Sequence, residues 1–140
     1  MEEIVFLKIE SIEKCLERIE KKLEQDEYNI EDYDIQDVIV LNLQRACQQS
    51  IDLAMFIVSE LGLGIPRTSV EAFQKLLDKK IITIENFENM KGMVGFRNIA
   101  VHQYQSIDYN IVEYVIKNRL SDFYDFNKAI IRKLSDNMYN

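Results

Sequence analysis

The stretch IQDVIVLNLQRACQQSIDLAMFIVSEL, residues 35–61, keeps an apolar pattern with helical spacing and contains neither glycine nor proline. Both residue types follow at once in GLGIP, residues 62–66, a composition that ends helices. The stretch is therefore predicted to be one long helix with one apolar face. That face carries Val38, Leu41 or Asn42, Ala46, Ile51, Ala54, Ile57 and Leu61.

A first helix is predicted before this one, over residues 2–25. Residues 26–34 are acidic and lose the helical pattern, so they read as a polar connection in which Asp34 caps the long helix. The apolar face of the first helix consists of Ile12, Leu16, Ile19 and Leu23.

Further helices are predicted after the glycine-containing turn. Residues 68–71, Thr-Ser-Val-Glu, have the form of a capping box before a short third helix. Thr83 is expected to cap a fourth helix from about Ile84, and Asp108 a fifth segment that continues, as one bent helix, to near the C-terminus. Gly92 and Gly95 lie inside the fourth helix, which suggests that a neighbouring helix or a second subunit approaches closely there.

The composition agrees with a helical fold. The chain has 140 residues, 47% of them hydrophobic, with one proline and four glycines. This length supports one well-filled core, and so few turn formers leave little material for a sandwich or barrel. We expect a single all-α domain over residues 1–140, with about five helices.

The charge and the cysteines restrict the possible partners and surroundings. A net charge of −7 argues against sequence-independent nucleic-acid binding by the whole surface, so any RNA site must be local. Cys15 and Cys47 stand alone in amphipathic runs, as small buried residues in a reducing compartment do. With no leader or membrane-spanning stretch recognised, we expect a cytoplasmic protein without membrane contact. The basic residues considered for a local patch are Lys75, Lys79, Lys80, Lys91 and Arg97, and most of the lysines are expected to be ordinary solvated residues.

The residues most suggestive of chemistry are RNIAVHQY, residues 97–104, which include His102, the only histidine of the chain. Histidine exchanges protons near neutral pH, and the arginine fork suits phosphate oxygens, so Arg97 and His102 resemble half of a phosphodiester-cleaving site. A purely structural histidine is the competing interpretation. No zinc or di-iron ligand pattern, phosphate-binding glycine loop or Gly-x-Ser-x-Gly motif is present, so we expect no metal and no cofactor.

The spacing of these residues sets a geometric problem. On a continuous helix Arg97 and His102 point about 140° apart, so we expect the helix to end or loosen near Ala100. Asn98, four residues before His102, is a candidate to orient the imidazole through a hydrogen bond. Metal-free RNA cleavage needs a base, an acid and cationic stabilisation, which two copies meeting at a symmetric interface would supply.

At these residues the chain resembles the HEPN superfamily, and more narrowly the HepT-like toxins of HEPN/MNT toxin–antitoxin pairs. The resemblance rests on the Arg-x4-His-x-Tyr form of residues 97–104 and extends to VLNLQRAC, residues 40–47, and LGIP, residues 63–66. It implies a HEPN-like up-and-down helical bundle that dimerises.

The same resemblance implies a function. In a type VII-like system, the catalytic residues Arg97 and His102 of two copies form a metal-independent endoribonuclease site, with Asn98 as the polar neighbour. The implied substrate is RNA, either tRNA or mRNA. The resemblance also implies that a cognate MNT nucleotidyltransferase antitoxin uses ATP to attach AMP to Tyr104, which would switch the toxin off.

Two other functions remain open on the sequence. The first is a non-catalytic helical dimer that binds and regulates a nucleotidyltransferase partner. The second is a helper protein in which Arg97 and His102 hold a nucleotide without cutting RNA.

Overall fold

The computed structural model describes residues 1–24 and 32–139, with side chains up to residue 136. Within these ranges every regular element is a helix, so the predicted all-α class is confirmed. The described residues form six α-helices rather than about five, with one 3₁₀ turn. The elements are α1 (Glu2–Glu24), α2 (Tyr33–Glu60), α3 (Ser69–Asp78), α4 (Ile84–His102), η1 (Tyr104–Ser106), α5 (Tyr109–Asn118) and α6 (Leu120–Tyr139).

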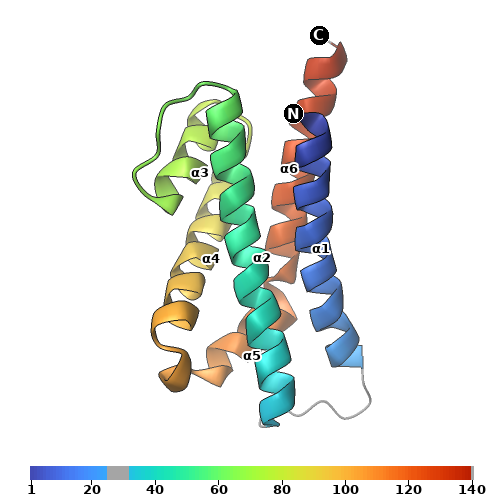
Figure 1. The fold of residues 1–140 in the computed structure, drawn as a ribbon, viewed down its shortest axis with the longest axis vertical. Coiled ribbons are helices and arrows are strands. Elements are labelled where there is room, and N and C mark those ends of the chain that lie inside the picture. The colour runs from blue at the N-terminus through green and yellow to red at the C-terminus, as the bar shows by residue number, and fades with distance from the viewer. Residues whose placement is uncertain (25–31, 140) are drawn as a thin grey trace.

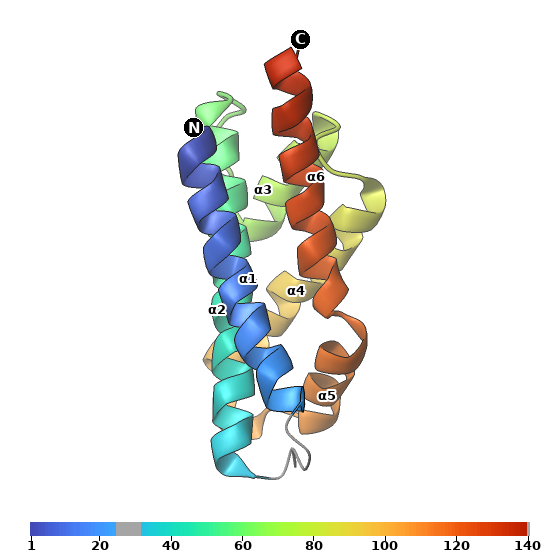
Figure 2. The ribbon, with the colours of Figure 1, turned by 90° about the vertical axis from the view of Figure 1, so that its right-hand side faces the viewer.

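The long helices lie roughly along one axis of the molecule (Figure 1). α1 and α2 run side by side in opposite directions, and α6 lies beside α1 (Figures 1 and 2). The core fills the space between the helices, and the rings of Phe73 and Phe126 meet edge to face there, with centroids 5.4 Å apart. Among its largest fully buried side chains are Phe73, Phe123, Phe126, Ile12, Leu16, Ile19, Leu43, Leu53 and Ile130.

The predicted helix starts are confirmed where the capping signal is local. Thr83 accepts a hydrogen bond from Asn86 N at 3.0 Å while the Asn86 side chain accepts one from Thr83 N, which completes a capping box for α4. Asp108 caps α5 as predicted. The predicted box at α3 forms only in half, because Thr68 accepts from Glu71 N but the Glu71 carboxylate accepts from Arg67 N.

Two predicted boundaries are wrong. α2 begins before Asp34, because Asp32 is its N-cap and accepts hydrogen bonds from Asp34 N and Ile35 N. The segment after Asp108 is not one bent helix, because the backbone at Arg119 (φ −124°, ψ 1°) leaves the helical region and separates α5 from α6. Most of the predicted polar connection, residues 26–31 of 26–34, lies outside the described residues.

Both cysteines are free and buried, as the sequence predicted. Burial raises the pKa of the Cys47 thiol to about 12. In the described part of the chain, no helix combines the length and the apolar character needed to cross a membrane.

Candidate active site at the C-terminal end of α4

α4 carries the motif residues, and it stays helical through all of them except Tyr104. The expected end near Ala100 is wrong: the helix runs to His102, and Gln103 N still donates to Ile99 O at 2.8 Å. The Cα–Cβ bonds of Arg97 and His102 therefore point about 140° apart. Helix geometry alone does not bring the two side chains of one chain together.

Asn98 reduces this separation. Arg97 Nη1 donates to Asn98 Oδ1 at 3.1 Å. Around the helix Asn98 lies about 100° from Arg97 and about 40° from His102, so this bond draws the guanidinium toward the His102 side of α4. No hydrogen bond joins Asn98 to His102 among the described residues. The amide thus contacts the arginine, where the sequence had suggested the imidazole.

The charge of the Arg97 guanidinium is not neutralised by a carboxylate in the described residues. The side chain is half-buried, and its charge reaches Cys47 on α2, where it lowers the thiol pKa against the larger effect of burial. No ion pair to a carboxylate forms in the described part of the chain, and Nε is buried without a hydrogen-bond partner there. A positive group held in place and not neutralised is suited to phosphate oxygens.

His102 and Tyr104 are both exposed at the same end of the bundle. Tyr104 follows the end of α4 in η1, and its side chain is 42% accessible to solvent. Its hydroxyl donates a hydrogen bond to Asp37 Oδ1, on α2, 67 residues away in sequence. This bond, more than any other cause, raises the pKa of Tyr104 to about 12.

Sequence reasoning missed Asp37. It lies on the exposed side of a helix that also begins with Asp32 and Asp34, so it resembles an ordinary N-terminal acidic residue. Only the packing that places the start of α2 beside η1 distinguishes it from these neighbours.

The basic residues do not form one patch. Lys79 and Lys80 precede the N-terminus of α4, whereas His102 ends it, and a helix of 19 residues separates them by about 28 Å. On α4, Arg97 is the cation closest in sequence to His102. In the described residues no group of three or more His, Cys, Asp or Glu side chains could hold a metal ion.

An open groove lies next to the motif, between α4, α5 and the start of α6. Gly92 and Gly95 line it, and a Cβ atom added at either would meet no atom within 4 Å. The close approach predicted from these glycines is therefore absent within the chain as described. Gly95, Ile99 and His102, at spacings of four and three, follow one stripe of α4, so the groove leads toward the histidine.

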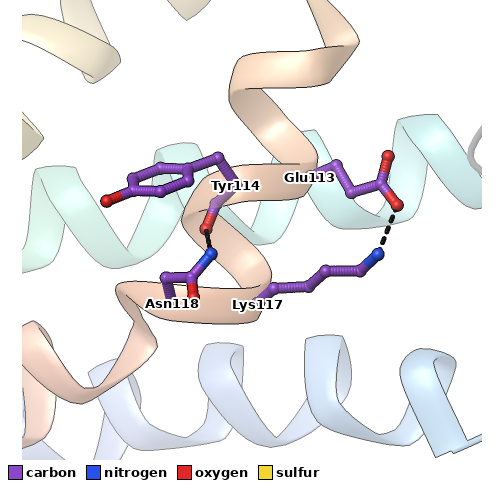
Figure 3. A network of polar contacts seen from close by, with 4 residues as sticks. All are labelled: Glu113, Tyr114, Lys117 and Asn118. Atoms are coloured by element: carbon purple, nitrogen blue, oxygen red, sulfur yellow. Dashed lines mark hydrogen bonds and ion pairs between the residues drawn. The ribbon is translucent and has the colours of Figure 1, made fainter.

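The groove also exposes three apolar side chains, next to the charged Arg119 and Asp122. Ile99, Ile111 and Tyr114 are 43%, 49% and 54% exposed. Figure 3 shows the Tyr114 ring extending to one side of α5, while Glu113 and Lys117 pair at 2.6 Å on the other side. The Tyr114 ring lines the groove, where the central carbon of the Arg119 guanidinium lies 6.0 Å from the ring centroid.

Comparisons with known proteins match the chain to nucleases. The family model described as "Ribonuclease HepT-like" matches residues 10–130. The mRNA nuclease HepT of Shewanella oneidensis is 40% identical over 130 residues, covering 93% of this chain and 98% of that protein. The tRNA nuclease HepT of Aphanizomenon flos-aquae is 30% identical over 122 residues, covering 86% and 82%.

A solved structure matches as well. It is the tri-AMPylated HEPN toxin of Shewanella oneidensis in complex with an MNT antitoxin. The match has a TM-score of 0.87 and 39% identity, and it covers 94% of this chain and 99% of that one.

Proposed function

The chain belongs to the HepT-like ribonuclease family, and from this premise we propose that it is the toxin of a HEPN/MNT pair that cuts RNA with Arg97 and His102 of two copies. It is an endoribonuclease, as the sequence predicted. Beyond this activity, we propose the catalytic residues, the dimer, the RNA substrate and the control by a nucleotidyltransferase.

The chemistry needs more groups than one chain supplies. The 2′-hydroxyl must lose a proton, the leaving 5′-oxygen must gain one, and the phosphate must be stabilised as its charge grows. One imidazole does not act as base and acid in the same step. Two copies of His102 divide these roles, and the unneutralised Arg97 guanidinium stabilises the phosphate.

The observation that carries the proposal is the open groove that leads to His102. Exposed apolar side chains beside two glycines suit a helix of a second copy, because a glycine face lets backbones approach closely. In a two-fold arrangement residues near the axis meet their own copies. A second chain seated on this groove would bring both His102 side chains toward one cleft.

Cleavage of labelled RNA in excess chelator tests the catalytic part. We expect unmodified wild type, and the control Gln105→Ala at an exposed neighbouring position, to cleave, whereas His102→Ala and Arg97→Ala do not. Mass spectrometry first verifies that Tyr104 is unmodified. If no form cleaves while the chain still binds the nucleotidyltransferase, the non-catalytic regulator is the better account.

Control by AMP attachment to Tyr104 is tested separately. The charged nucleotide would sit two residues from His102, where it fills and repels the site that must accept RNA phosphate. With the cognate nucleotidyltransferase and ATP, we expect wild type and Tyr109→Phe to gain AMP mass and lose cleavage. Tyr104→Phe should gain no mass and stay active, and modification of that variant would contradict the assignment.

A further inference from the structure

Asp37 and Tyr104 meet across two elements that are distant in the sequence. Asp37 lies near the start of α2, and Tyr104 in the turn after α4, at the same end of the bundle (Figure 1). The Tyr104 hydroxyl donates to Asp37 Oδ1. Both side chains are exposed, so a second protein can reach the hydroxyl without unfolding either element.

We propose that Asp37 is the general base that accepts the phenolic proton of Tyr104 when this hydroxyl is nucleotidylated, an inference that rests on the proposed function. The Tyr104 oxygen forms a bond to the α-phosphorus of ATP. The bond from that phosphorus to the oxygen bridging toward the β-phosphorus breaks, and pyrophosphate leaves with the electron pair. The phenolic proton passes to the Asp37 carboxylate.

The reaction needs such a base at neutral pH. With the pKa of Tyr104 raised to about 12, almost no phenolate is present before the reaction starts. The hydroxyl therefore has to lose its proton as the new bond forms, to an acceptor already within hydrogen-bond reach. Asp37 is the acceptor that the described structure places there.

The same contact accounts for the choice of tyrosine. Tyr109 also senses the Asp37 charge, which raises its pKa, but burial is the larger cause for that group. In the described structure the Asp37 carboxylate hydrogen-bonds the hydroxyl of Tyr104 and not that of Tyr109. Asp37 thus makes one of two nearby phenols the nucleophile.

The test measures AMP transfer from ATP by the cognate nucleotidyltransferase, with the full chain as substrate. Asp37→Asn keeps an oxygen that can accept the Tyr104 hydrogen bond but takes up no proton. We expect it to lower kcat for transfer about 100-fold or more, with KM for ATP and binding to the nucleotidyltransferase unchanged. Asp34→Asn removes the same charge one turn earlier and should be modified like wild type.

The possible results distinguish a failure of this inference from a failure of the proposed function. If wild type is modified at Tyr104 and Asp37→Asn is modified equally fast, Asp37 is not the base, while the proposed control stands. If Asp34→Asn slows transfer as much as Asp37→Asn, general negative charge explains the effect and the inference fails. If wild type itself is not modified, the proposed modification fails and the role of Asp37 fails with it.

Asp37→Glu is a second variant, for the case in which Asp37→Asn perturbs folding. It keeps a carboxylate at this position and should therefore retain part of the wild-type rate.

Discussion

The two ends of α4 are built differently. At the N-terminal end, Thr83 and Asn86 bond each other's backbone, and Phe87 and Met90 are buried behind them. At the C-terminal end, Arg97 keeps an unneutralised charge, His102 is exposed, and Tyr104 is held by another helix. The first end satisfies its polar groups locally, whereas the proposed function assigns those of the second end to a substrate and a partner. We therefore expect substitutions at the first end to change stability, and substitutions at the second end to change activity.

The largest expected effect comes from His102→Ala. Loss of the imidazole should reduce RNA cleavage by about 10²- to 10⁴-fold, because both the base and the acid are removed. Since the side chain is exposed, the urea midpoint of unfolding should stay within error of wild type. Cleavage that persists at more than a tenth of the wild-type rate would show that His102 is not part of the chemistry.

Arg97→Lys, at the same end of α4, is expected to reduce RNA cleavage less than His102→Ala does. Lysine keeps the charge but loses the planar fork that bonds Asn98 and suits phosphate, so cleavage should fall by about 10- to 100-fold. Asn98→Ala should lower kcat in the same direction if it holds the guanidinium. Full activity of both variants, measured on the same RNA, would argue against a positioned arginine.

Gly95→Leu tests whether the groove beside this end receives a second chain. A Cβ atom added at Gly95 meets no atom of its own chain within 4 Å, so replacing this helical glycine should stabilise the monomer by up to about 1 kcal/mol. The same side chain should obstruct a close partner, which sedimentation would record as dissociation, with a loss of cleavage. Glu17→Leu on the exposed side of α1 is the control for an added surface leucine. An intact, active Gly95→Leu dimer would place the interface elsewhere.

The smallest expected effect lies at the other end of α4. Thr83→Ala removes the hydrogen bond to Asn86 N and should lower the free energy of unfolding by about 1 kcal/mol, measured by urea denaturation. Cleavage per folded molecule should not change. A large loss of activity in this variant would mean that the two ends of α4 are coupled and do not act separately.

The same contrast explains what the sequence could predict. Thr83 and Asp108 were identified as caps because the groups they bond are within a few residues. No glycine or proline lies at the break near Arg119, and the apolar pattern continues across it, so the sequence predicted one bent helix. Asp37 could not be recognised, because its partner Tyr104 is 67 residues away and the contact depends on how α2 packs beside η1.

The motif shows how much of the candidate site could be predicted from the sequence. Residue types at 97, 98, 102 and 104 suggested the chemistry that we propose, but the course of the helix was predicted wrongly. From the sequence, the helix was expected to unwind near Ala100 and so to bring Arg97 toward His102. In the structure the backbone stays helical, and the Arg97 guanidinium bonds the Asn98 side chain. Side-chain choices of this kind depend on local packing that spacing rules do not contain.

The central claim, one cleft built by two chains, is tested most directly by mixing subunits. Wild type and His102→Ala are unfolded together in equal amounts, refolded, and assayed for RNA cleavage at constant total chain concentration. If both histidines are needed, only dimers of two wild-type chains cleave, and the mixture should retain about a quarter of the wild-type activity. If it retains about half, each chain cleaves with its own residues, and the two-chain site is contradicted.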